Sequence, residues 1–359
     1  MPPRRRLPPI VPRIALALAS VALVLLVAEA AVRLIVGDQS GRFRRLPPRM
    51  PEAWRDLPKI GRDASETLRR PGARGTIAGA LIEMNEHGLR GPARSVEKPD
   101  DVFRIALIGD SVTMGWGVLY EETYGAIIEE RLDQRSPDRR IEVLNLGLSG
   151  YDTTQLMDRL RLQGLAFEPD LFVYGFTIND VEGDHYQRFA EGGYRDPRKY
   201  LHARSHLLRF LGPRIDALRD FIAPPRDSYT FELHYNYFEN PAAWAAVEVG
   251  LHRLSDWATR RDACVLVLIH THLTSLRFMH PFHGEYEKIR TSAEARGFAV
   301  VHSWPEHAGE DEEQLWVTAF DHHPNVRGHA LLADSLTRGL DALPESCWVS
   351  AKTRRRATR

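Results

Sequence analysis

Four short stretches of the sequence place a serine, glycines, an asparagine and histidines where side chains could do chemistry. Three of these stretches begin at the ends of apolar runs, and the fourth precedes the last helical pattern of the chain. In an open α/β sheet the working site lies beyond the carboxyl ends of the strands, so we expect the four stretches to meet there. They read GDS at 109–111, NLGLSGYDT at 145–153, GFTIND at 175–180 and DHHPNVRGH at 321–329.

Together the four stretches supply every part of a site for acyl transfer. Ser111 can attack a carbonyl carbon, His323 can accept the serine proton, and Asp321 can orient the imidazole. The backbone N–H groups of Ser111 and Gly147 and the side-chain amide of Asn179 can stabilise the oxyanion that forms. The sequence therefore predicts a serine nucleophile with a histidine base.

Each of these residues also has an ordinary structural interpretation. Asp110 and Ser111 are good helix caps, Gly147 suits a tight turn, Asn179 suits a cap, and His323 suits an exposed surface. The catalytic hypothesis depends on their occurrence together.

The elements that must position these residues alternate between strand and helix patterns. Apolar runs predict strands at 103–108, 141–146, 171–176, 264–269 and 298–301. Helical patterns lie at 122–135, 152–164, 242–262, 285–296 and 327–341. This alternation is typical of a parallel sheet covered by helices. We therefore expect a three-layer α/β/α sandwich, flavodoxin-like, with a parallel five-stranded sheet.

The connection between the third and fourth strands, roughly 85 residues, is much longer than an ordinary crossover. We interpret residues 183–241 as a cap-like insertion near the site. Apolar residues at helical spacing predict an amphipathic helix within 201–222. A surface helix packed on its own domain and a helix lying on a membrane are the alternatives.

The four stretches, in this order, resemble the SGNH/GDSL hydrolases, a family named for Ser, Gly, Asn and His in such blocks. The resemblance covers residues 99–343 and implies Ser111 as nucleophile, with Gly147 and Asn179 in the oxyanion hole and His323 and Asp321 completing the triad. The last block usually reads Asp-x-x-His, whereas one residue separates the acid and the base here. Polysaccharide O-acetyltransferase relatives include members with this shorter spacing.

Upstream, MNEHGLRGP at 84–92 is similar to a lead-in of membrane-anchored bacterial members of the family. Asn85, Gly88 and Arg90 stand at the matching places. By resemblance, this lead-in implies placement in the bacterial envelope.

The N-terminus predicts a membrane anchor. Residues 1–13 are basic, and the apolar stretch 14–36 is long enough to cross a bilayer at about 1.5 Å per residue. Glu29 and Arg33 interrupt it four residues apart. We expect a single span of the inner (cytoplasmic) membrane, with the catalytic domain periplasmic or extracellular. The alternative is a signal peptide cleaved after Ala28-Glu29-Ala30.

The remaining segments and the charge limit the partners. Residues 37–98, rich in Pro, Arg and Gly, are interpreted as a membrane-proximal connector, and residues 344–359 as a basic tail. Lys plus Arg and Asp plus Glu both number 48, which gives no indication of a nucleic-acid partner. Cys264 and Cys347 could form one disulfide.

The 15 histidines include pairs that raise the alternative of a zinc site, namely His270 with His272, His280 with His283, and His322 with His323. No His-Glu-x-x-His helix accompanies them, and the predicted chemistry needs no metal or cofactor. His270 and His272 end the fourth predicted strand; they could line the pocket of the site, but we interpret them as partly exposed strand-end residues.

These observations predict a serine esterase acting on acyl esters, with O-acetyl groups of an envelope or extracellular carbohydrate as a candidate substrate. An O-acetyltransferase using the same triad and a non-catalytic glycan- or lipid-binding module are the alternatives.

Overall fold

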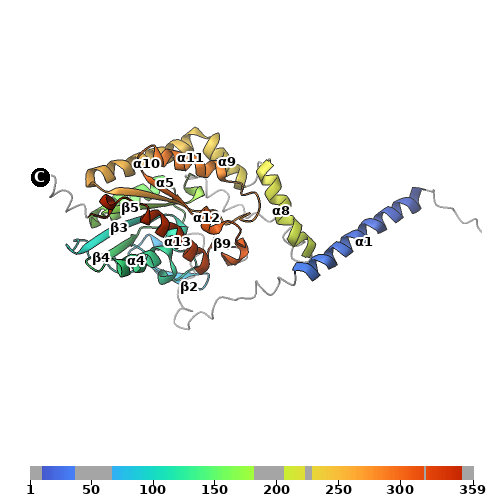
Figure 1. Ribbon diagram of the computed structural model, residues 1–359, viewed down its shortest axis with the longest axis horizontal. Helices are drawn as coiled ribbons and strands as arrows, with labels where there is room; N and C mark the ends of the chain where they lie inside the picture. Colours follow the sequence, from blue (N-terminus) through green and yellow to red (C-terminus); the bar gives the residue numbers. More distant parts are fainter. Residues whose placement is uncertain (1–9, 37–66, 182–205, 223–228, 319–320, 350–359) are drawn as a thin grey trace, which may run out of the picture.

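The computed structural model describes residues 10–36, 67–181, 206–222, 229–318 and 321–349 of the 359-residue chain (Figure 1). Its centre is a five-stranded sheet in which all neighbouring strands run parallel, in the order β4-β3-β5-β6-β7. Taken in chain order this is 2-1-3-4-5, the flavodoxin-like arrangement. The strands are β3 (Val102–Gly109), β4 (Arg140–Asn145), β5 (Leu171–Phe176), β6 (Cys264–Ile269) and β7 (Ala299–His302).

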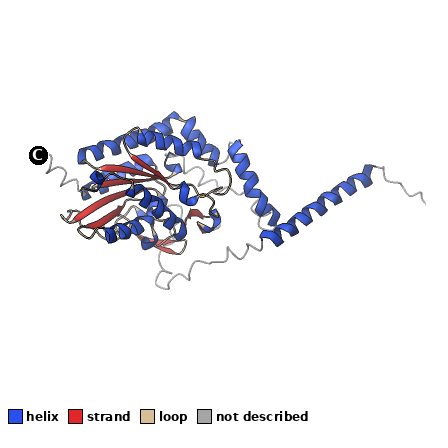
Figure 2. Cartoon of the chain, in the orientation of Figure 1, coloured by secondary structure: helices blue, strands red, loops and turns tan. Residues whose placement is uncertain are grey.

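Helices cover both faces of the sheet because its strands are apolar on both sides (Figure 2). On β3, Ile105 and Leu107 pack in one core cluster and Ala106 and Ile108 in another. The first cluster includes residues of α4 (Tyr124–Arg135) and α13 (Val326–Asp341). The second includes residues of α5 (Thr153–Arg159), α9 (Tyr229–Phe238), α10 (Pro241–Arg261) and α11 (His283–Glu294). The predicted α/β fold with a parallel five-stranded sheet is confirmed.

Shorter elements complete the described chain. The helix predicted at 152–164 is α5 followed by a π-helical turn at Leu160–Gly164 and a 3-10 turn at Leu165–Phe167. The other elements are α3 (Ser111–Met114), α12 (Trp304–His307), β8 (Trp316–Thr318), β9 (Asp321–Pro324), and 3-10 turns at Tyr120–Glu122, Ile178–Val181, Glu312–Gln314 and Glu345–Trp348.

The described part of the predicted connector, residues 67–98, carries regular structure packed on the domain. It contains an antiparallel hairpin of β1 (Arg74–Ile77) and β2 (Ala80–Glu83). The cluster that this hairpin joins consists of Leu68, Ile77, Ile82, Met84, Met114 and Leu148. Interpreting residues 67–98 as a bare connector is therefore wrong, because their apolar side chains are buried against the segments that follow β3 and β4. The sequence gives little sign of this hairpin, because each of its strands has only four residues.

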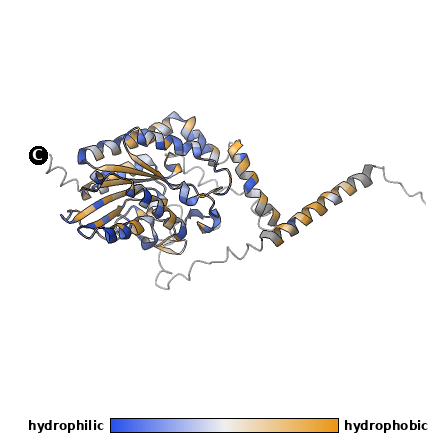
Figure 3. Ribbon diagram, in the orientation of Figure 1, coloured by the Kyte–Doolittle hydropathy of each residue, from blue (hydrophilic) through white to orange (hydrophobic). Residues whose placement is uncertain are grey.

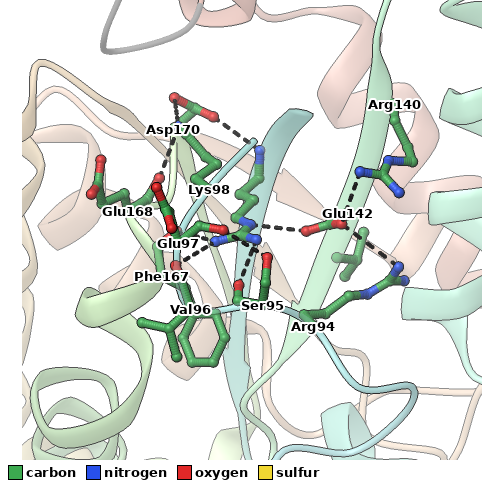
Figure 4. Close-up of polar contacts among 12 residues, drawn as sticks. Arg94, Ser95, Val96, Glu97, Lys98, Arg140, Glu142, Phe167, Glu168 and Asp170 are labelled. Atoms are coloured by element: carbon green, nitrogen blue, oxygen red, sulfur yellow. Dashed lines mark hydrogen bonds and ion pairs between the residues drawn. The ribbon is translucent and has the colours of Figure 1, made fainter. Parts of the chain in front are cut away.

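Residues 94–98 cross the amino-terminal edge of the sheet and are held there by buried charges. Arg104 of β3 is fully buried and donates from Nε to Glu142 Oε2 at 2.9 Å. Its Nη1 and Nη2 atoms donate to the carbonyl oxygens of Val96, Phe167 and Ser95 at 2.7 to 3.0 Å. Figure 4 shows Arg94 and Arg140 pointing towards Glu142, and Lys98 beside Asp170, which accepts a hydrogen bond from Lys98 Nζ at 2.7 Å. These contacts hold residues 94–98 against the domain.

We expect Arg104→Met to lower the free energy of unfolding by about 3 kcal/mol. Removing one partner of a buried ion pair typically costs about 3 to 5 kcal/mol. The cost falls at the lower end because Arg94 and Arg140 each lie 3.9 Å from Glu142 and still compensate its charge. Urea denaturation of the wild-type and variant chains measures the difference. A loss below 1 kcal/mol would show that the backbone carbonyls find other donors.

At the N-terminus, α1 (Ile10–Val36) extends away from the sheet and carries mostly apolar residues (Figures 1 and 3). Glu29 accepts a hydrogen bond from the backbone N–H of Leu207 at 2.8 Å, at the start of α8 (His206–Ile222). Among the residues described, no helix has both the length and the apolar character required to cross a membrane. The predicted transmembrane anchor at 14–36 is therefore not supported; charged residues occur within this helix, and Glu29 contacts another helix.

The predicted cap-like insertion, 183–241, is described only in part. α8 lies beside α1, whereas α9 buries Leu233 and Tyr237 in the main core. Helix α9 therefore belongs to the layer formed with α10 and α11. The rest of the insertion lies outside the described residues.

Candidate active site

Ser111 is the first residue of the short helix α3, directly after β3. Asp110 caps this helix, since its Oδ1 accepts the N–H of Val112 at 3.0 Å. A Cβ on Gly109 would lie 2.0 Å from Thr113 Oγ1 and 2.6 Å from the carbonyl oxygen of Gly175, so a side chain at this position would clash. The capping role therefore belongs to Asp110, and the Ser111 side chain is left for other contacts.

The structure brings Ser111, His323 and Asp321 into one hydrogen-bonded chain. His323 Nε2 lies 2.8 Å from Ser111 Oγ, and His323 Nδ1 lies 2.6 Å from Asp321 Oδ1. Burial opposes ionisation of Asp321, but the hydrogen bonds from His323 and Trp116 and the charge of His323 together outweigh it, and the pKa of Asp321 is lowered from its usual value. A carboxylate at Asp321 can accept a hydrogen bond from His323 Nδ1–H, an arrangement that leaves the Nε2 lone pair directed at Ser111 Oγ.

His322 points away from this chain of contacts. Residues 321–324 form β9, in which neighbouring side chains alternate in direction. The His322 ring stacks on Trp316 at 3.9 Å between ring centroids. The one-residue spacing between Asp321 and His323 thus follows from extended backbone.

Trp116 is a site residue that sequence reasoning missed. Its Nε1–H donates to Asp321 Oδ2 at 2.7 Å, and its ring stacks on His323 with centroids 5.1 Å apart. Trp116 and Asp321 are 205 residues apart. Its place five residues after Ser111 was the only available signal, and nothing in the sequence connects it to Asp321.

The three predicted oxyanion donors lie at the same edge of the sheet but differ in their surroundings and in their hydrogen bonds. The N–H of Ser111 lies in the first turn of α3, where no intrahelical partner exists. Gly147 lies against the α3 backbone, since a Cβ there would be 2.3 Å from the nitrogen of Met114. Its own N–H donates to Asn145 Oδ1 at 2.9 Å, a contact that was not expected. Asn179 lies in the 3-10 turn after β5 and is partly buried.

Beneath Ser111 lies a buried polar network. Asp110 accepts a hydrogen bond from Thr177 Oγ1 at 2.8 Å, its Oδ2 lies 3.2 Å from Ser111 Oγ, and burial raises the pKa of Asp110. His270 Nδ1 lies 3.1 Å from Thr177 Oγ1, and His270 is 3 % exposed. The interpretation of His270 as a partly exposed strand-end residue is therefore wrong, because α4 and α13 also supply side chains that cover this end of β6.

Asp180 is buried beside this network. It accepts a hydrogen bond from the Tyr174 hydroxyl at 2.8 Å, and its Oδ1 has no hydrogen-bond partner among the described residues. Burial, followed by the charge of Asp110, raises the pKa of Asp180 well above its usual value. Ionisation of Asp180 beside Asp110 is therefore disfavoured.

Three buried histidines predict a loss of stability in mild acid. Burial lowers the pKa values of His270, His280 and His329 to about 3. Above pH 6.5 these imidazoles are neutral in both states. Below pH 6.5 only the unfolded chain binds protons at these histidines. The free energy of unfolding therefore decreases as the pH is lowered, by at most about 1.4 kcal/mol per pH unit for each histidine.

Chemical denaturation between pH 7 and pH 5 measures this slope, and His329→Gln, which does not titrate, is the control that should reduce the slope by about a third, because His270 and His280 remain. A free energy of unfolding independent of pH over this window would contradict the prediction.

The remaining histidine pairs make contacts unrelated to a metal. His280 Nε2 lies 3.0 Å from the Tyr286 hydroxyl, and its ring stacks on Trp304. Tyr286 also receives the backbone N–H of His272. In the described ranges, His, Cys, Asp and Glu side chains form no group of three or more that could hold a metal ion.

An α/β/α sandwich with a serine, a histidine and an aspartate hydrogen-bonded in series at the carboxyl edge is the arrangement typical of a serine hydrolase. The family model of GDSL-like lipases and acylhydrolases matches residues 107–331, more than half of the chain. The chain therefore belongs to the GDSL-like lipase/acylhydrolase family, whose members hydrolyse ester bonds. This confirms the resemblance found in the sequence.

Similar solved structures share low identity with the chain. LAE5, an α/β hydrolase from the metagenome of Lake Arreo, Spain, is 19% identical, covering 67% of this chain and 96% of its own, with a TM-score of 0.43. The acetylxylan esterase Axe2 of Geobacillus stearothermophilus is 16% identical, covering 67% and 95%, with a TM-score of 0.44. A two-domain esterase active on acetylated mannans is 20% identical, covering 70% and 50%, with a TM-score of 0.38. A search of curated proteins found no match.

Proposed function

We propose that this chain is a serine esterase that cleaves acyl esters through an acyl-enzyme on Ser111. The observation that carries the proposal is the 2.8 Å contact between Ser111 Oγ and His323 Nε2, with Asp321 on the other ring nitrogen. Ser111 Oγ bonds to the ester carbonyl carbon while its proton passes to His323. The carbon–alcohol bond then breaks, and the leaving alcohol takes that proton.

Water completes the cycle by the same steps. His323 removes a proton from water, the hydroxide attacks the acyl carbon, and Ser111 leaves with the proton from His323. Asp321 stabilises the imidazolium in both halves of the reaction. A sugar hydroxyl in place of water would give the O-acetyltransferase instead.

A small acyl group suits this site best. Ser111 is 6 % exposed, and Val112 and Met114 of the same short helix are buried, which favours a compact acyl group over a long chain. We therefore propose an acetyl ester, with an O-acetylated carbohydrate as the first substrate to test.

The oxyanion is stabilised by the backbone N–H of Ser111 and the side-chain amide of Asn179. The N–H of Gly147 becomes a third donor when its hydrogen bond to Asn145 Oδ1 is broken. We expect Asn179→Ala to lower kcat by about 100- to 1000-fold, since one oxyanion donor is worth about 2.7 to 4 kcal/mol. KM should change far less. Steady-state kinetics on an activated acetyl ester measure both constants, and an unchanged kcat would remove Asn179 from this role.

The full chain, incubated with an activated acetyl ester and a fluorophosphonate probe, tests the proposal directly. We expect turnover and covalent labelling of the wild type, and neither with Ser111→Ala. An unlabelled, inactive wild type with a native circular dichroism spectrum would favour the non-catalytic binding module. Adding an acceptor sugar separates transfer from hydrolysis.

We also propose that the catalytic domain is exported to an oxidising compartment. The support is the disulfide between Cys264 and Cys347, because such bonds persist mainly outside the reducing cytosol. A C-terminal reporter that is active only in the periplasm should be active in cells producing the fusion. Activity of a cytosol-dependent reporter instead would contradict export.

A further inference from the structure

The lead-in motif at residues 84–92 forms a compact loop whose geometry is set by Asn85. The Asn85 side chain accepts the N–H groups of His87 and Leu89 at 2.9 and 3.0 Å and donates to the carbonyl of Pro92 at 2.9 Å. Gly91 has a φ of +113°, and a Cβ on it would lie 2.3 Å from the Tyr120 ring. The loop therefore holds Arg90 in one place against the residues that follow α3.

Arg90 is attached to the catalytic edge at two points. Its backbone N–H donates to the carbonyl of Asn145, the last residue of β4, at 3.1 Å. Its Nη2 donates to the carbonyl of Val118 at 3.0 Å and to that of Leu81 in β2 at 3.2 Å. One nitrogen thus joins the N-terminal hairpin to the loop after the nucleophile.

The burial of Arg90 is costly. The side chain is 2 % exposed, and within the part of the chain that the structure describes its Nε and Nη1 have no hydrogen-bond partner. Burial lowers the pKa of Arg90 to about 10. A half-satisfied buried cation breaks the usual rule for polar groups, and such departures concentrate where function requires them.

The loop that Arg90 holds carries Trp116. Between Gly115 and Leu119 the chain turns back, with the N–H of Trp116 donating to the carbonyl of Ser111 at 3.0 Å. Gly117 lies against Val317 of β8, since a Cβ there would be 2.7 Å from that side chain. Val118, whose carbonyl Arg90 binds, is two residues beyond Trp116, which donates to Asp321 and stacks on His323.

We propose that Arg90 is a positioning residue for the Ser111 site, acting through the carbonyl of Val118 on Trp116 and through Trp116 on Asp321 and His323. This proposal rests on the proposed function, because it assumes that Asp321 and His323 serve catalysis at Ser111. Arg90 fixes the loop, and the loop fixes the indole N–H. The indole holds the Asp321 carboxylate and one face of the His323 ring in the geometry that the serine needs. The lead-in motif is thereby part of the catalytic unit.

Kinetics of four full-length variants test this proposal. Arg90→Met removes the donor, Arg90→Lys restores a cation with N–H donors, and Trp116→Phe keeps an aromatic ring without its N–H. Arg104→Met is the matched control, because Arg104 is equally buried and binds backbone carbonyls at the opposite edge of the sheet. Rates are taken per folded molecule, measured by circular dichroism.

We expect kcat to fall about 10- to 100-fold in Arg90→Met and about tenfold in Trp116→Phe, with KM within about twofold, because a small misplacement of catalytic groups costs up to about 100-fold. Arg90→Lys should recover part of the loss, and Arg104→Met should keep the wild-type kcat. If Arg104→Met lost as much as Arg90→Met, or if both Arg90→Met and Trp116→Phe kept the wild-type kcat, the proposal would be overturned.

A second measurement does not depend on turnover. The low-field proton NMR signal of the hydrogen bond between His323 and Asp321 is recorded in the Ser111→Ala background. We expect Trp116→Phe and Arg90→Met to shift or broaden this signal and Arg104→Met to leave it in place. An unmoved signal in the first two overturns the positioning role. Full turnover by Ser111→Ala itself would instead defeat the proposed function, while the signal still reports on Arg90.

Discussion

Replacing either Ser111 or His323 by alanine lowers kcat by roughly a thousandfold or more, whereas His322→Ala costs much less. The reason is the direction of the side chains in β9. His323 lies 2.8 Å from the serine oxygen, and His322 stacks on Trp316 on the other side of the strand. Losses of this size are typical when a member of such a triad is removed, because the parts act as a unit. Single-turnover acylation with an activated acetyl ester measures the effect.

His322→Ala is the matched control for this prediction, since it removes the same side chain one position away. Asp321→Ala is expected to lose less than His323→Ala, because Asp321 orients the base and does not itself take the serine proton. A dead His322→Ala beside an active His323→Ala would mean that the base is the other histidine and that residues 321–323 turn in solution.

Removing the disulfide lowers the free energy of unfolding by about 4.5 kcal/mol. Cys264 at the start of β6 and Cys347 near the C-terminus are separated by 83 residues. In the chain-entropy model, a loop of this length restricts the unfolded state by about that amount. The change is comparable to half of a typical domain's whole stability. Urea denaturation of the full chain with Cys264→Ser and Cys347→Ser together gives the value.

The same experiment in dithiothreitol distinguishes the loss of the disulfide from any effect of the two serine substitutions. Reduced wild type should unfold at the urea concentration of the double variant, and the reductant should not alter the double variant. Equal midpoints for oxidised wild type and the double variant would show that the two cysteines are not bonded in solution. Activity per folded molecule should be unchanged, because neither cysteine contacts the site.

The strands were predictable to within about one residue because each is a mainly apolar run, although β3 and β4 also carry charged residues. The run ending at Gly109, for example, is β3 (Val102–Gly109). Such runs are local properties of the chain, and burial on both faces leaves them no alternative pattern. The hairpin of β1 and β2 was missed because strands of four residues give too short a pattern to stand out from a Pro- and Gly-containing segment.

Some features of the candidate site could likewise be predicted from the sequence, and others could not. The juxtaposition of Asp321 and His323 was predictable, since residues two apart in an extended strand point the same way. His270 was misjudged because burial at a strand end depends on which helices cover it. The hydrogen bond from Gly147 to Asn145 depends on a backbone turn that the residue types alone leave open.

By itself, the sequence determined the order of strands and helices, the glycine-lined turn that presents Ser111, and the pairing of acid with base. These follow from periodicity and from the conformations that single residues allow. Only the tertiary structure decided that Trp116 meets Asp321 across 205 residues and that Arg90 reaches the carbonyl of Val118. The physical reason is that a hydrogen bond between distant segments requires both ends placed to within a few tenths of an ångström. That placement comes from the packing of all the layers together and from no single stretch of chain.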